Sequence, residues 1–138
     1  MSDRALRIGA FVAALAGAGI AAYLTWAHYA DSPVICVSGG GCATVQSSEY
    51  ATIAGVPVAV LGLVAYLVVA ALLVWDSAVA RLAATTLALV GALFGVYLLA
   101  LQLFVIDAVC MWCLANDVVV GPALAVLTAL RLRFAATA

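Results

Sequence analysis

Charged side chains are scarce in this sequence, and lysine is absent altogether. Asp, Glu, Lys and Arg make up only 8% of the 138 residues, and the net charge is −1. So little charge, nearly balanced in sign, favours neither a nucleic-acid binder nor a polybasic protein of the membrane surface. Hydrophobic residues account for 70% of the chain, which is more than a soluble domain of this size can bury. The composition therefore predicts that lipid is the main solvent.

Four apolar stretches are long enough to cross a bilayer, which takes about 20 helical residues. Three of them contain no charged residue, and the fourth is interrupted by Asp117. We expect an all-α membrane protein, a single domain over residues 1–138, folded as a four-transmembrane-helix bundle. The helices are predicted over 8–30, 56–75, 82–106 and 109–130, with an extracytoplasmic loop over 31–55 that contains a short interfacial half-helix over 43–51.

The basic residues predict how the bundle is oriented. With four spans, the N-terminus, the loop between spans two and three and the C-terminus lie on one side of the membrane. All five basic residues fall in these segments, at Arg4, Arg7, Arg81, Arg131 and Arg133. The positive-inside rule makes that side cytoplasmic. We therefore expect both termini in the cytoplasm of a bacterial inner or plasma membrane.

All four cysteines are predicted on the opposite, extracytoplasmic side, where disulfides form and persist. Cys110 and Cys113 form a Cys-X-X-Cys motif at the start of the fourth span, with Asp107 as the predicted N-cap. Unpaired N–H groups and the helix dipole favour a thiolate there, and a thiolate is ready for disulfide exchange. The motif predicts a redox-active pair at the outer rim of the membrane.

The other pair, Cys36 and Cys42, encloses three consecutive glycines, Gly39 to Gly41. Glycine gives a backbone wide conformational freedom. A segment of this kind suits a shuttle whose sulfurs face a soluble partner at one moment and the Cys-X-X-Cys motif at the next.

Two simpler interpretations of the cysteines stay open at this point. They could form structural disulfides in a non-enzymatic, disulfide-stapled four-span protein, or they could bind zinc. The first is weakened by the Cys-X-X-Cys spacing, because so short a loop gains little from being closed. The second is weakened because a structural zinc site usually closes within a compact domain.

Two polar residues within the spans are further candidates. Asp117 lies four residues after Cys113 and on the same helical face. An acid at that depth is costly, so Asp117 is predicted to deliver a proton to a bound substrate, although it could simply interact favourably with the helix dipole. Gln102 is predicted to hydrogen-bond a bound substrate or, alternatively, a neighbouring helix.

Taken together, the motifs resemble the vitamin K epoxide reductase family. The resemblance covers nearly the whole chain and includes the number of helices. It rests on the loop with Cys36 and Cys42, on Ser47-Ser48-Glu49-Tyr50, on Gly55-Val56-Pro57-Val58 opening a helix, and on Cys110-Met111-Trp112-Cys113.

The resemblance implies an enzyme, a quinone-dependent thiol oxidoreductase that supports disulfide formation, and a role for each cysteine. Cys36 would exchange disulfides with a thioredoxin-fold oxidant of the DsbA type. Cys42 would relay electrons to Cys110, and Cys113 would face the quinone, of the menaquinone, ubiquinone or vitamin K type. With a quinone as substrate, Asp117 would deliver a proton to the reduced quinone and Gln102 would hydrogen-bond a quinone carbonyl. Ser48 would assist near the active site, and no metal is implied. The alternative enzyme is a quinone-linked thiol oxidase of the DsbB type.

The sequence departs from the family pattern in two places. Animal members carry a Tyr four residues beyond the second cysteine of the Cys-X-X-Cys motif, and Asp117 takes that position here. Many bacterial members carry a fused thioredoxin-like domain, whereas only Phe-Ala-Ala-Thr-Ala follows Arg133. We therefore expect the redox partner to act in trans.

Overall fold

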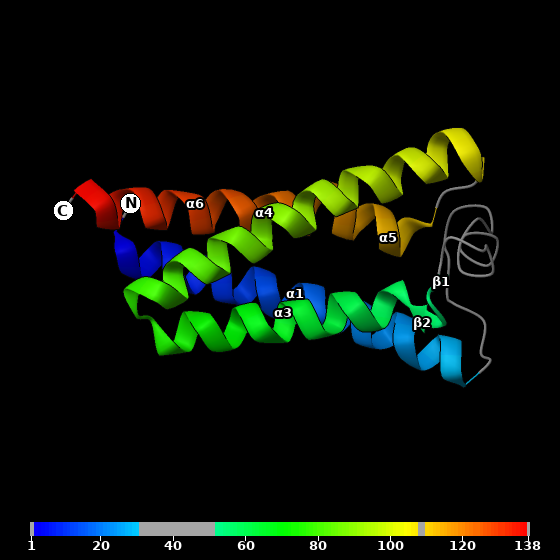
Figure 1. Cartoon of the computed structure of the whole chain (residues 1–138), viewed down its shortest axis with the longest axis horizontal. Helices are drawn as coiled ribbons and strands as arrows, with labels where there is room; N and C mark the ends of the chain where they lie inside the picture. The colour runs from blue at the N-terminus through cyan, green and yellow to red at the C-terminus, as the bar shows by residue number, and fades with distance from the viewer. Residues whose placement is uncertain (1, 31–51, 108–109, 138) are drawn as a thin grey trace.

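The computed structural model of the chain describes residues 2–30, 52–107 and 110–137. Cys36, Cys42, Ser48 and the predicted half-helix over 43–51 lie outside these residues. The described part is almost entirely helical (Figure 1). Its helices are α1 (Asp3–Tyr29), α3 (Val58–Trp75), α4 (Ala78–Ala100), the π-helix η2 (Leu101–Val105), α5 (Met111–Ala115), the π-helix η3 (Asn116–Val120) and α6 (Gly121–Thr137).

Four helical stretches in the described residues are long and apolar enough to span a membrane. They are Asp3–Tyr29, Val58–Trp75, Ala78–Val105 and Met111–Phe134. The third joins α4 to η2, and the fourth joins α5, η3 and α6. The predicted all-α, four-helix architecture is therefore confirmed.

Small residues form much of the interior of the bundle, while large apolar ones point outward. Alanines dominate the buried cluster, for example Ala10, Ala14 and Ala84, which are at most 1% exposed. By contrast, Leu93 is 72% exposed and Phe104 is 83% exposed. Lipid gives apolar side chains no reason to turn inward, so small residues that let helices approach closely hold such bundles together.

A short hairpin precedes the second span. The strands β1 (Thr52–Ile53) and β2 (Val56–Pro57) pair antiparallel. Ala54 and Gly55 between them have φ angles of 53° and 84°, and two positive φ angles in a two-residue turn match the right-handed twist of a hairpin. Pro57 follows as the residue just before α3, as the Gly-Val-Pro motif predicts.

Arginines and aspartates tie together one end of the bundle, where both termini and the turn between α3 and α4 lie (Figure 1). Arg131, only 2% exposed, donates from Nε to Asp3 at 3.1 Å and contacts Asp76 through its Nη2. Arg81 donates to the same Asp76 carboxylate at 3.1 Å, and Arg7 donates to the backbone oxygen of Leu73 at 2.9 Å. Three arginine-bearing segments distant in the sequence thus meet.

Asp76 is the centre of this cluster and caps α3 in a left-handed conformation, with φ 58°. Burial alone would raise the pKa of its carboxyl group, but hydrogen bonds from Arg81 and Arg131 and the charges of both hold this pKa below its ordinary value. The carboxylate is therefore stabilised in its ionised form at neutral pH.

Candidate functional site

The Cys-X-X-Cys motif lies at the end of the bundle opposite the arginines, where α5 begins (Figure 1). Cys110 is the residue just before the helix, with φ −97° and ψ 119°, and it is fully buried. Its carbonyl accepts the N–H of Leu114 at 2.8 Å, which closes the first turn around Cys113. One helical turn therefore separates the two cysteines.

The prediction that Asp107 caps this helix is wrong. Asp107 has a left-handed backbone, with φ 57°, and the helix begins only at Met111. Cys110 is the residue that precedes the helix, and its N–H, which has no partner within the helix, is bonded to a side chain of the preceding span. That side chain is Gln102.

Gln102 joins the motif to the buried acid. Its Oε1 accepts the N–H of Cys110 at 2.9 Å, and its Nε2 donates to Oδ2 of Asp117 at 3.3 Å. Both Gln102 and Asp117 are buried, with 2% and 4% exposure. Of the two predicted contacts of Gln102, the structure contains the one between helices.

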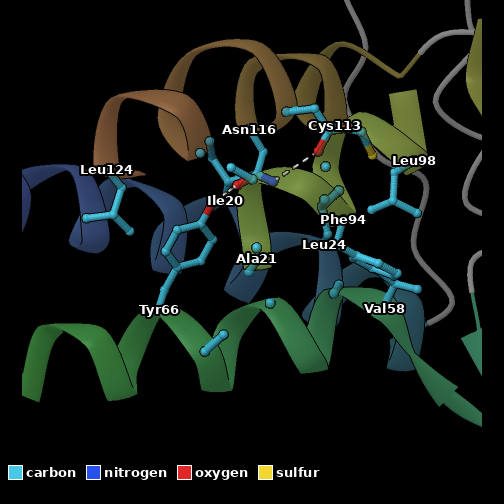
Figure 2. A pocket seen from close by; sticks show the side chains of 18 of the residues that line it. Ile20, Ala21, Leu24, Val58, Tyr66, Phe94, Leu98, Cys113, Asn116 and Leu124 are labelled. Atoms are coloured by element: carbon cyan, nitrogen blue, oxygen red, sulfur yellow. Dashed lines mark hydrogen bonds between the residues drawn. The ribbon is translucent and has the colours of Figure 1, made fainter. Parts of the chain in front are cut away.

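A second set of hydrogen bonds reaches Asp117 from the opposite side. Asn116 donates from Nδ2 to Oδ1 of Asp117 at 3.2 Å. Tyr66, which extends from α3 across the bundle, donates its hydroxyl to Oδ1 of Asn116 (Figure 2). The Asp117 carboxylate therefore accepts one amide N–H on each oxygen.

Two π-helical turns bring these side chains together. Gln102 lies on η2, and Asn116 and Asp117 lie on η3. A π-turn inserts an extra residue and shifts the side chains that follow, which is why such turns recur at functional sites. Gly95 of α4 gives the acid room, because a Cβ at that position would lie 3.3 Å from Oδ1 of Asp117.

Five polar residues share the lining of a cavity of about 210 Å³ inside the bundle. Cys113, Gln102, Asn116, Asp117 and Tyr66 line it together with apolar residues from α1, α3, α4 and α6. Figure 2 shows Leu24, Val58, Phe94, Leu98 and Leu124 among the apolar ones. Such a cavity fits a ligand with a polar head and an apolar body.

Four residues predicted from the sequence thus meet at one place, namely Cys110, Cys113, Gln102 and Asp117. Sequence reasoning missed Tyr66 and Asn116. A signal for Tyr66 was present, because it has the only side-chain hydroxyl within α3, and a lone polar group in a membrane helix usually finds a partner. Within the described residues, no group of three His, Cys, Asp or Glu could hold a metal ion.

Comparisons with known proteins show the family of the chain. A 52-residue segment is 48% identical to the thiol-disulfide oxidoreductase LTO1 of Arabidopsis thaliana, a match that covers 37% of this chain and 14% of that protein. The chain thus spans only a small part of that relative's length. The profile of the vitamin K epoxide reductase family matches residues 9–128, which include all four helical spans in whole or in large part. The chain is therefore an integral membrane protein that belongs to the vitamin K epoxide reductase family.

Proposed function

We propose that this protein is a thiol–quinone oxidoreductase, which takes electrons from protein dithiols and passes them to a membrane quinone in support of disulfide formation. The observation that carries the proposal is the position of Cys113. It lines a mostly apolar cavity that also has several polar side chains in its wall, inside a bundle whose outer surface suits lipid. The name of the Arabidopsis relative, a thiol-disulfide oxidoreductase, supports the thiol half of the reaction.

The cavity suits the two parts of a quinone. A quinone carries two carbonyl oxygens that accept hydrogen bonds, and its long tail is apolar. The side-chain amides of Gln102 and Asn116 each have two N–H groups, and their bonds to Asp117 use one apiece. The second N–H of either amide is a suitable donor to a quinone oxygen. A quinone of the menaquinone, ubiquinone or vitamin K type would satisfy these requirements.

The electron route that we propose begins outside the described residues. A thioredoxin-fold partner of the DsbA type reduces Cys36 and Cys42, and Ser48 assists in the same loop. Cys42 then attacks Cys110 of the oxidised pair, which forms a Cys42–Cys110 disulfide and frees the thiolate of Cys113. Cys36 attacks Cys42 in turn, which closes the Cys36–Cys42 disulfide and releases Cys110. The Cys110–Cys113 dithiol then passes its two electrons to the quinone, and the Cys110–Cys113 disulfide is restored. A difference of about 30 mV in reduction potential already changes the equilibrium constant of a two-electron exchange of this kind tenfold.

The proposed orientation puts the arginine end in the cytoplasm and the Cys-X-X-Cys end on the extracytoplasmic side. Arg7, Arg81 and Arg131 meet at one end of the bundle, and basic residues are retained on the cytoplasmic side of membrane proteins. The cysteines would then face an oxidising compartment, where a disulfide-generating enzyme is needed.

Quinone reduction by the purified full chain tests the function. In lipid nanodiscs with dithiothreitol as donor, the wild-type protein should reduce quinone, measured by the loss of quinone absorbance. Cys113→Ala and Cys110→Ala should abolish the reaction. Cys36→Ala should spare it with dithiothreitol, which bypasses the shuttle, but should lose it with a reduced thioredoxin-fold protein as donor. A wild-type protein without quinone reduction would contradict the proposal, and equal losses in Cys36→Ala and Cys113→Ala with dithiothreitol would contradict the order of transfer.

A further inference from the structure

The hydrogen bonds around Asp117 form two series, and in both of them each group donates toward the Asp117 carboxylate. One series begins at the N–H of Cys110 and passes through the amide of Gln102 to Oδ2 of Asp117. The other begins at the hydroxyl of Tyr66 and passes through the amide of Asn116 to Oδ1. Each amide uses its oxygen to accept and its nitrogen to donate. Both series therefore end on the carboxylate of Asp117, which acts only as an acceptor.

No cation neutralises this carboxylate among the described residues that line the cavity. The charged side chains Arg7, Arg81 and Arg131 are engaged at the other end of the bundle (Figure 1). A charge without a counter-ion is costly away from water, and the two amide donors offset only part of that cost. If Asp117 served structure alone, an uncharged side chain would avoid this cost.

Asp117 also lies beside the groups that react. Gln102 links the backbone N–H of Cys110 to the Asp117 carboxylate, and Cys113 lines the same cavity as Asp117. An acceptor in the wall of a ligand cavity, close to the Cys-X-X-Cys motif, is well placed to move protons from the thiols to a ligand.

We propose that Asp117 is the proton-transfer residue of this site, and that it carries protons from the Cys-X-X-Cys thiols to the oxygens of the quinone. This inference rests on the proposed function. Gln102 and Asn116 are positioning residues, because they act through the carboxylate that they hold.

The proposed transfer balances. Oxidation of the Cys110–Cys113 dithiol forms one S–S bond and releases two electrons and two protons. Reduction of a quinone to a hydroquinone takes up the same electron pair and one proton on each oxygen. The carboxylate of Asp117 accepts a proton from a thiol, donates it to a quinone oxygen and repeats the transfer with the second proton. Its charge is the same at the end of the cycle as at the start.

Among the described residues, few other titratable groups lie near Asp117. Tyr66 of α3 and Cys113 line the cavity with it, and Cys110 is linked to it through Gln102. The described cavity-lining residues of α1, α4 and α6 are apolar or glycine, and they include Gly95 against the carboxylate. If the pH dependence of kcat disappears when Asp117 alone is replaced, the titrating group is therefore Asp117 and not a thiol or the phenol.

The test compares Asp117→Asn with Asp107→Asn in the full chain, with dithiothreitol and a short-chain quinone over a series of pH values. Asp107 is exposed, and asparagine tolerates its left-handed backbone, so this variant is a matched control. Asp117→Asn should lower kcat by about a hundredfold, the usual effect of losing an acid–base group, with KM nearly unchanged. It should also flatten the pH profile of kcat, whereas Asp107→Asn should match the wild type.

Two further measurements separate chemistry from folding. Asp117→Glu should restore part of kcat together with the pH dependence, and thermal unfolding should show that Asp117→Asn is folded. If a folded Asp117→Asn keeps kcat and its pH profile, the proton-transfer role is overturned while quinone reduction by the wild type still stands. If the wild type itself fails to reduce quinone, both the inference and the proposed function are overturned.

Discussion

The ring of Tyr66 fills the space that a side chain at Gly17 would occupy. A Cβ at Gly17 would lie 2.4 Å from both Cε1 and Cζ of that ring. The absence of a side chain on α1 thus lets the phenol pass between the helices and reach Asn116. Gly17 is a packing position whose effect extends to the hydrogen bonds around Asp117.

A methyl group at this position is therefore expected to disturb the site. In Gly17→Ala the phenol must move, and overpacking of this kind costs about 1–3 kcal/mol. We expect a lower free energy of unfolding and slower quinone reduction, measured by thermal unfolding and by loss of quinone absorbance. Gly19→Ala is the matched control, because nothing lies within 4 Å of a Cβ there. If Gly17→Ala and Gly19→Ala have the same free energy of unfolding and the same rate of quinone reduction, the role given to Gly17 is contradicted.

The four spans were predictable from the sequence because lipid leaves a simple signal. A segment that crosses a bilayer as a helix must be long, apolar and nearly free of charge, and that property needs no knowledge of neighbours. The Cys-X-X-Cys pair, Gln102 and Asp117 stand out against such a background. Polar residues in a membrane helix are few and therefore easy to pick out.

The contacts among these residues were not predictable in the same way. Tyr66 and Asn116 meet across a sequence separation of 50 residues, and they are brought together because α3 and the fourth span both pack against α1 and α4. Asp107 has the residue type of an N-cap, but its backbone is left-handed and the helix begins only at Met111. Neither outcome can be read from the local sequence pattern.

Gln102 should be required for the geometry of the motif. Gln102→Leu keeps a similar volume but removes the acceptor of the Cys110 N–H, and a buried donor without its partner costs about 1–3 kcal/mol. It also removes one of the two donors to Asp117. We expect a lower unfolding temperature and a fall in kcat for quinone reduction of about tenfold, which corresponds to about 1.4 kcal/mol in the barrier.

Thr86→Val provides the control on the same helix. Thr86 is exposed and donates only to the backbone oxygen of Leu82 within its own helix, at 2.9 Å. Like Gln102→Leu, Thr86→Val replaces a polar side chain with an apolar one. It should leave kcat and the unfolding temperature nearly unchanged. A Gln102→Leu variant with wild-type kcat would show that the hydrogen bond does not position Cys110 for the reaction.

Arg131 should stabilise the arginine end of the bundle. Arg131→Met keeps most of the buried apolar stem but removes one of the two arginines that pair with both Asp3 and Asp76, and leaves Arg81 as the other. Breaking a buried ion pair costs about 3–5 kcal/mol and an exposed pair at most about 1 kcal/mol. The Asp3 and Asp76 side chains are 49% and 21% exposed. We therefore expect Arg131→Met to lower the free energy of unfolding by about 2 kcal/mol, a value between these limits. Arg4→Met is the control, since Arg4 is exposed at the same end.

The orientation of the bundle can be tested by labelling single cysteines in a background without the native ones. Val56 in the hairpin and Val79 at the start of α4 are exposed at opposite ends. In bacterial spheroplasts, Val56→Cys should react with a membrane-impermeant maleimide. Val79→Cys should react only after permeabilisation. The reverse pattern would put the Cys-X-X-Cys end in the cytoplasm and contradict the proposed orientation.

Asp76 should make stability depend on pH on the acid side. Its folded-state pKa lies below the ordinary value because the hydrogen bonds and charges of Arg81 and Arg131 outweigh the effect of burial. A group with a lowered folded pKa binds fewer protons in the folded state, so its stabilisation is complete above the unfolded pKa of about 3.9. That stabilisation is lost as the pH falls through the folded pKa.

Asp76→Asn isolates this effect, because asparagine tolerates the left-handed backbone of Asp76 but cannot ionise. At neutral pH the variant should unfold at a lower temperature than the wild type, since it lacks the ion pairs with Arg81 and Arg131. As the pH falls below about 4, the wild type should lose stability faster and the difference should shrink. Thermal unfolding in detergent over a pH series measures both curves. Parallel curves would mean that the Asp76 carboxylate does not contribute to stability through its charge.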